Sequence, residues 1–127
     1  MKMVWETHKI LDENISVNPT AVRVPVLVGH AESIYIETEK EIDIELAKNC
    51  LNEFAGISVI DDVEEVDFPT SFEHGHGTDD VYVGRIRKGL SKNNSLNLWV
   101  VADNVRKGAA LNTVSYTHLT LPTTWSV

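Results

Sequence analysis

The stretch DVYVGRIRKGLSKNNSLNLWVVADN, Asp80 to Asn104, is the most informative about the fold, because it contains two segments typical of β-strands with a turn signal between them. The segments 80–88 and 96–104 are rich in Val, Leu, Ile, Tyr and Trp, which are the residues that favour strands. The residues KNNS that precede the second segment are typical of a hairpin turn. We therefore expect two neighbouring antiparallel strands.

Earlier in the chain the pattern predicts one helix and two strands. Residues 1–13, MKMVWETHKILDE, place apolar residues and His8 on one helical face, but no capping residue precedes them. A helix that begins in mid-pattern indicates that the chain was cut there. Residues 20–28, TAVRVPVLV, and 32–39, ESIYIETE, predict strands, and the second alternates as a strand with one buried face does.

A second helix is predicted after Asp43, which is a suitable N-cap, and Gly56 is a suitable C-terminal stop. Its expected apolar face consists of Leu46, Ala47, Cys50, Leu51 and Phe54. A short strand is expected in 56–61, a long acidic surface loop in 61–80, and a helix start in 104–112. Together these elements predict an α+β fold in which a mixed sheet has helices packed on one face.

Composition limits the functional classes. The chain of 127 residues has room for one domain, and 43% apolar with 24% charged residues is ordinary for a globular protein. Its net charge of −8 argues against nucleic acid or an anionic membrane as the main partner. No apolar run is long enough to span a bilayer or to serve as a secretory signal. One cysteine fits a reducing compartment, so we expect a cytoplasmic protein.

The final segment, VSYTHLTLPTTWSV (114–127), differs from the rest because it contains no Asp, Glu, Lys or Arg. It resembles the in-frame translation of a transposase-library sequencing adapter. We therefore expect the natural domain to occupy residues 1–113 and residues 114–127 to be a non-native tail. Tyr116, His118 and Trp125 are accordingly not taken as site residues.

Four blocks in order carry a resemblance to a known family: KMVWETHKIL, VRVPVLVGHAES, DVYVGRIRK and LWVVADNVRKGAALN. Together they resemble the C-terminal catalytic and dimerisation domain of aspartate-semialdehyde dehydrogenase. This implies the α+β architecture of the C-terminal domains of glyceraldehyde-3-phosphate-dehydrogenase-like enzymes. It also implies NADPH-dependent conversion of aspartyl phosphate to aspartate semialdehyde and phosphate, for the biosynthesis of lysine, threonine, methionine and isoleucine, by a homodimer.

The resemblance implies a role for four residues. Arg23 matches the arginine that grips the substrate carboxylate, for which a planar guanidinium is well suited. His30 matches the catalytic acid/base, since a histidine can take and return a proton near neutrality. Lys2 matches the lysine of a phosphate-binding Glu-x-x-Lys pattern whose glutamate would precede Met1. Asn104 matches a position that contacts NADP.

The relative orientation of Arg23 and His30 can also be considered from strand geometry alone, independently of the family resemblance. On one regular strand, positions 23 and 30 would face opposite ways. Gly29 offers a bulge or bend directly before His30, which would restore the parity and turn both side chains into one cleft.

The rest of the machinery is not in this chain. The nucleophilic cysteine of the family belongs to its nucleotide-binding half, and Cys50, in none of the four blocks, is expected to be a buried and inert thiol. No glycine-rich phosphate loop of the GxGxxG type occurs. We expect the fragment alone to be inactive. A related N-acetyl-γ-glutamyl-phosphate reductase fragment and a non-catalytic dimerisation module remain alternatives.

Simpler explanations exist for several charged residues. Lys2 has Glu6 four residues later and could form an exposed helical ion pair. The sequence EHGHGTDD (73–80) has too few ligands at defined spacing to predict a metal site, so we expect none. Arg85 and Arg87 indicate either a solvated stripe or, with the family included, a subunit interface.

Overall fold

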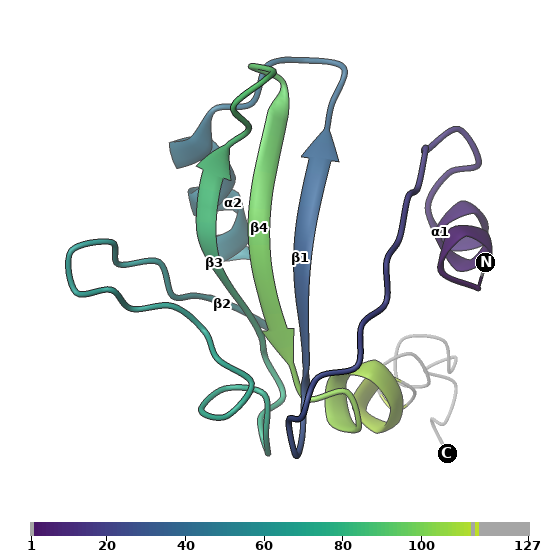
Figure 1. Ribbon diagram of the computed structural model, residues 1–127, viewed down its shortest axis with the longest axis vertical. Helices are drawn as coiled ribbons and strands as arrows, with labels where there is room; N and C mark the ends of the chain where they lie inside the picture. Colours follow the sequence, from purple (N-terminus) through teal and green to yellow (C-terminus); the bar gives the residue numbers. More distant parts are fainter. Residues whose placement is uncertain (1, 113, 115–127) are drawn as a thin grey trace, which may run out of the picture.

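The computed structural model describes residues 2–112 and residue 114 (Figure 1). The expected non-native tail thus lies, apart from residue 114, outside the described residues. In chain order the elements are α1 (Lys2–Ile10), β1 (His30–Glu37), α2 (Ile44–Glu53), β2 (Ile57–Val59), β3 (Val81–Lys88), β4 (Ser95–Ala102) and the π-helical turn η1 (Arg106–Ala110).

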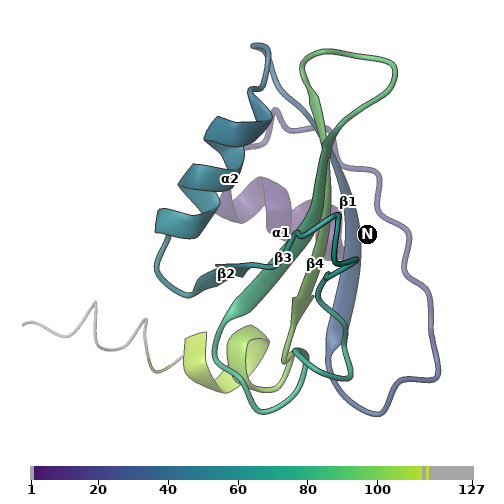
Figure 2. The same ribbon diagram turned by 90° about the vertical axis from the view of Figure 1, so that its left-hand side faces the viewer.

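The four strands form one sheet in the order β1-β4-β3-β2. β3 and β4 pair antiparallel as predicted, β1 pairs antiparallel with the other side of β4, and β2 runs parallel to β3. Figure 2 shows α2 packed on one face of this mixed sheet. The predicted α+β class is therefore confirmed.

The core lies between α2 and the centre of the sheet. Val83, Ile86 and Leu96 are buried there, and Ala47 and Leu51 of α2 pack against them. Helix α2 begins where the capping residue predicts, because the Asp43 carboxylate accepts a hydrogen bond of 2.9 Å from the Leu46 amide. This core fixes β3 and β4, and through them the end of the sheet at which β1 begins.

The predicted burial of Cys50 is wrong, because the thiol is exposed. The side of α2 that faces the sheet is formed by Ile44, Ala47 and Leu51. Cys50 precedes Leu51 by one residue, which is a rotation of about 100° on a helix of 3.6 residues per turn. It therefore lies at the solvent-facing edge, as do Leu46 and Phe54, which are 63% and 67% exposed.

The predicted strand over 20–28 is also wrong. These residues belong to an extended segment without strand pairing, which runs past β1 and reverses direction at its end (Figures 1 and 2). Pro25 has no N–H to give to a ladder, and the Val26 amide bonds locally to the Val24 carbonyl at 2.9 Å. The apolar run that predicted a strand is consequently exposed, with Leu27 at 99%.

Candidate functional site

Three segments that are distant in sequence meet at one end of the sheet. They are the turn at 27–29 before β1, the loop 70–78, and the residues 103–106 that follow β4. His30 is directly opposite Ala102 in the β1–β4 ladder, and the amide of Gly77 donates to the Asp103 carboxylate at 2.8 Å. Figure 1 shows this gathering at the lower end of the drawing. Two of the four predicted site residues, His30 and Asn104, lie here.

His30 is the first residue of β1 and is exposed. By the alternation along β1 its side chain shares a face with Ile34, whose ladder partner Leu98 packs against the core on the α2 side. The imidazole forms no hydrogen bond or ion pair with any other described residue. It is therefore available to a ligand at the end of the sheet.

Arg23 lies in the extended segment and is exposed, and its guanidinium has no ion-pair partner in the described part of the chain. The predicted bend before His30 is confirmed, since Gly29 has φ of +82°. Contrary to the prediction, however, the bend does not restore the parity of one continuous strand. Arg23 and His30 lie on two arms of a chain reversal, not on one strand, so strand parity does not relate them. That their side chains converge on one ligand stays a prediction.

Lys2 is the first residue of α1, and its ammonium lies 3.6 Å from the Glu6 carboxylate in a largely exposed pair. The helical ion pair is thus present. Helix α1 stands to one side of the sheet, away from the end at which β1 begins (Figure 1). The structure accordingly does not bring Lys2 next to His30.

Asn104 is half-buried in the turn between β4 and η1, and its amide has no hydrogen-bond partner among residues 2–112. Asp103 before it is 4% exposed and accepts hydrogen bonds from the amides of Gly77, Val105 and Arg106. The bond from Gly77, and next that from Arg106, lowers the pKa of Asp103. Asp103 was not among the predicted site residues, although a carboxylate just before a helix start is a recognisable capping signal.

The loop and η1 are also joined by an ion pair, in which the Arg106 guanidinium lies 2.6 Å from Asp79. This contact lowers the pKa of the Asp79 carboxyl. Both groups are about half exposed, so the pair contributes little beyond orienting the two segments.

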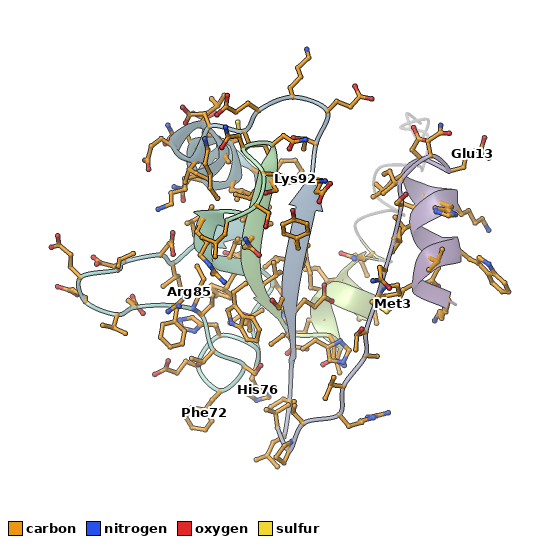
Figure 3. All side chains as sticks on the ribbon, turned by 45° about the horizontal axis from the view of Figure 1, so that its top comes forward. Met3, Glu13, Phe72, His76, Arg85 and Lys92 are labelled. Atoms are coloured by element: carbon orange, nitrogen blue, oxygen red, sulfur yellow. The ribbon has the colours of Figure 1, made fainter. Side chains whose placement is uncertain are left out.

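Arg85 and Arg87 line a cavity of about 470 Å³ together with Trp99, Phe68 and Phe72. The Arg85 guanidinium lies 5.6 Å from the Phe68 ring centroid, and the Trp99 indole donates to the Pro69 carbonyl at 2.9 Å. Trp99 alternates with the core-facing Leu98, so the cavity opens on the face opposite α2. Figure 3 labels Arg85 and Phe72, which both lie on the side of the strands away from α1.

The histidines of the loop are placed differently from each other. The His74 ring accepts a bond of 3.1 Å from the Thr70 amide and packs 5.0 Å from the Tyr82 ring, whereas His76 is exposed. No group of three or more His, Cys, Asp or Glu side chains is arranged to hold a metal ion within the described residues. None of the helices in that part of the chain has the length and apolar character of a membrane span.

Comparisons with known proteins agree on one family. The model of the semialdehyde dehydrogenase dimerisation domain matches residues 1–107. The aspartate-semialdehyde dehydrogenase of Shewanella violacea is 56% identical over 115 residues, which is 90% of this chain and 33% of that protein. That of Legionella pneumophila is 48% identical, over 94% of this chain and 35% of its own length.

A solved structure gives the same result. The crystal structure of aspartate semialdehyde dehydrogenase II from Vibrio cholerae, complexed with ASA, matches with a TM-score of 0.88 and 50% identity. The match covers 93% of this chain and 34% of that one. The chain therefore spans about a third of the length of the relatives that it matches.

Proposed function

Because this chain belongs to the semialdehyde dehydrogenase family, through the dimerisation domain, we propose that it is the C-terminal part of an aspartate-semialdehyde dehydrogenase. The complete enzyme would carry out NADPH-dependent reductive dephosphorylation of L-aspartyl-4-phosphate to L-aspartate 4-semialdehyde. This reaction would serve the synthesis of lysine (through diaminopimelate), threonine, methionine and isoleucine. The observation that carries the proposal is the 56% identity over nine-tenths of the chain to an enzyme of that name. A cytoplasmic location fits such a biosynthetic role.

His30 is proposed as the acid/base of this reaction. It is exposed at the first position of β1, and its imidazole has no competing partner among the described residues. The reaction needs a group that removes and returns a proton close to the reacting carbon. A histidine fixed at a strand end by a rigid sheet suits this task, because its backbone is held while its ring can reach the substrate.

Arg23 and Lys2 are proposed as the groups that bind the anionic substrate. The Arg23 guanidinium is unpaired in the described chain and could form two parallel hydrogen bonds with the substrate carboxylate. Lys2 would bind phosphate. Its exposed pair with Glu6 is a weak competitor, since such pairs are worth less than about 1 kcal/mol.

NADP is the proposed cofactor, and the residues around Asn104 fit one contact with it. The Asn104 amide is free to donate a hydrogen bond. The neighbouring Asp103 carboxylate is turned toward three backbone amides, so its charge opposes an anionic cofactor less than an unpaired carboxylate would. A bound nicotinamide would supply the hydride. Toward the cofactor, the role of this chain would be limited to holding one edge of it.

The face opposite α2 is proposed as the homodimer interface. The face carries Trp99 and Phe68 beside Arg85 and Arg87, and aromatic residues and arginine are enriched in protein interfaces. The acidic stretch 61–67 lies next to the same arginines in a second, smaller hollow. A surface with both charges can complement itself across a two-fold axis.

The experiment joins residues 1–113 to the nucleotide-binding half of a relative and measures NADP-dependent oxidation of aspartate semialdehyde in phosphate buffer. We expect activity, and we expect His30→Asn to lose about 100-fold or more of kcat, the range for removal of a general acid/base. His8→Asn, in α1, is the matched control and should retain the parental rate. Equal turnover by the parent and His30→Asn would refute the acid/base assignment. Oxidation of N-acetylglutamate semialdehyde instead would favour the reductase alternative.

A further inference from the structure

The backbone of the loop 70–78 is packed closely against the turn that precedes His30. Gly29 is buried, and a Cβ added to it would lie 2.5 Å from the carbonyl oxygen of Gly75. A Cβ added to Gly75 would in turn lie 2.7 Å from the carbonyl oxygen of Ser71. Both distances are shorter than a Cβ tolerates, so the backbones of Gly29, Gly75 and Ser71 form a stack in which positions 29 and 75 require glycine. We call this stack the glycine clamp.

Internal hydrogen bonds order the loop 70–78, so it can hold the Gly29 turn in place. The Thr70 amide donates to the His74 ring at 3.1 Å, the His74 amide donates to the Thr70 carbonyl at 2.9 Å, and the Thr78 hydroxyl donates to the His74 carbonyl at 2.9 Å. The Gly77 amide then ties the loop to the buried Asp103 at 2.8 Å. Since Asp103 also accepts hydrogen bonds from the Val105 and Arg106 amides at the start of η1, the loop and the segment that carries Asn104 form one hydrogen-bonded unit.

We propose that Gly75 is a positioning residue for His30, because the glycine clamp holds the turn from which the His30 side chain enters the site. The His30 imidazole has no hydrogen bond of its own in the described chain, so its direction is set by the backbone before and after it. The β4 ladder fixes the backbone on one side, and Gly29 against Gly75 fixes it on the other. The catalytic consequence of this proposal rests on the proposed role of His30.

The first test is Gly75→Ala in the joined enzyme described above. The added methyl would clash with the Ser71 backbone, so the Gly75 backbone must move away from Ser71. Because Gly75 is packed against Gly29, this movement should shift the Gly29 turn and displace His30. We expect kcat to fall by about 10- to 100-fold, since a displacement of about 1 Å can cost that much, with little change in the KM for the cofactor. Gly108→Ala is the matched control, because nothing lies within 4 Å of a Cβ there, and it should keep the parental kcat.

A double-mutant cycle separates positioning from a general loss of structure. If Gly75 acts through His30, adding Gly75→Ala to His30→Asn should cause no further fall in kcat. A fall of the same factor in both backgrounds would overturn the proposal. Should Gly75→Ala fail to fold, the isosteric Thr78→Val, which removes only the hydroxyl bond to His74, takes its place in the same cycle with an expected loss of a few-fold.

NMR of the 127-residue chain tests the glycine clamp without relying on a measurement of enzyme activity. Gly75→Ala should shift the ring signals of His30 and leave those of His8 in α1 unchanged. Unmoved His30 signals in a folded variant would overturn the clamp. If the signals move but His30→Asn of the joined enzyme keeps its rate, the clamp stands and the proposed acid/base function fails, so the two failures are distinguishable.

Discussion

The sheet with α2 and the N-terminal segment 2–28 treat apolar side chains in opposite ways. In the sheet, Val83, Leu96 and Val101 are 3%, 6% and 0% exposed. In the N-terminal segment, Trp5 and Leu27 are 72% and 99% exposed, although the segment is also rich in apolar residues. An apolar pattern therefore shows what a segment can bury, while the fold determines whether that segment is buried within the same chain. The first region supports its own fold, and the second adds little to the stability of this chain.

A Leu→Ala substitution in each region should give the largest difference in stability between the two. Leu96→Ala removes a 6% exposed side chain from the core and should lower the free energy of unfolding by about 3 kcal/mol. Leu27→Ala, at 99% exposed, should change it by less than about 0.5 kcal/mol. Urea unfolding followed by circular dichroism measures both. Similar losses at the two positions would mean that the N-terminal segment is packed after all.

A smaller effect, which depends on pH, should come from Asp103→Asn. The pKa of Asp103 is lowered in the folded state, so its carboxylate stabilises the fold fully above its unfolded pKa of about 3.9. This contribution is lost as the pH falls through the lower folded value. The variant should therefore be less stable than the parent at neutral pH, and the gap should close in acid. Thermal unfolding from pH 7 to pH 3 measures the gap, and a constant gap would contradict the role of the charge.

The smallest effect should come from Glu6→Gln in α1. The pair with Lys2 is exposed, at 84% and 54%, so its removal should cost no more than about 0.5 kcal/mol. The loss should disappear in high salt, because salt screens exposed charges. Helical content by circular dichroism at low and high salt provides the measurement. A larger loss that resists salt would show that α1 is more ordered by this pair than its exposure indicates.

Local sequence patterns predicted the sheet and α2, because in these elements the apolar periodicity and the capping residues match the way the elements pack. The hairpin strands 80–88 and 96–104 pair as expected, and Asp43 caps α2. The strand over 20–28 was mispredicted because periodicity does not reveal whether a partner strand is available. Cys50 was mispredicted because Leu46, Cys50 and Phe54 form an apolar stripe that no described element covers.

The candidate site was only partly readable from the sequence. His30 and Asn104 were found through the resemblance, and the structure places them at one end of the sheet. Gly75 was not found, because its role depends on a contact with Gly29, 46 positions away. The local capping signal of Asp103 was overlooked, and its bond to Gly77, 26 positions away, could not be predicted. Long-range backbone contacts of this kind leave no periodic signal in a single sequence.

The pairing of β1 with β4 has a consequence for folding during synthesis. It joins His30 to Ala102 and Glu37 to Ser95, residues that are 72 and 58 positions apart in the chain. At a synthesis rate of roughly 5–20 residues per second, β1 leaves the ribosome several seconds before its partner strand. The β3–β4 hairpin, with its short connection, can form first and then receive β1 along its free side. During that delay the charges of Glu32 and Glu37 protect a strand that would otherwise be prone to pair with other chains.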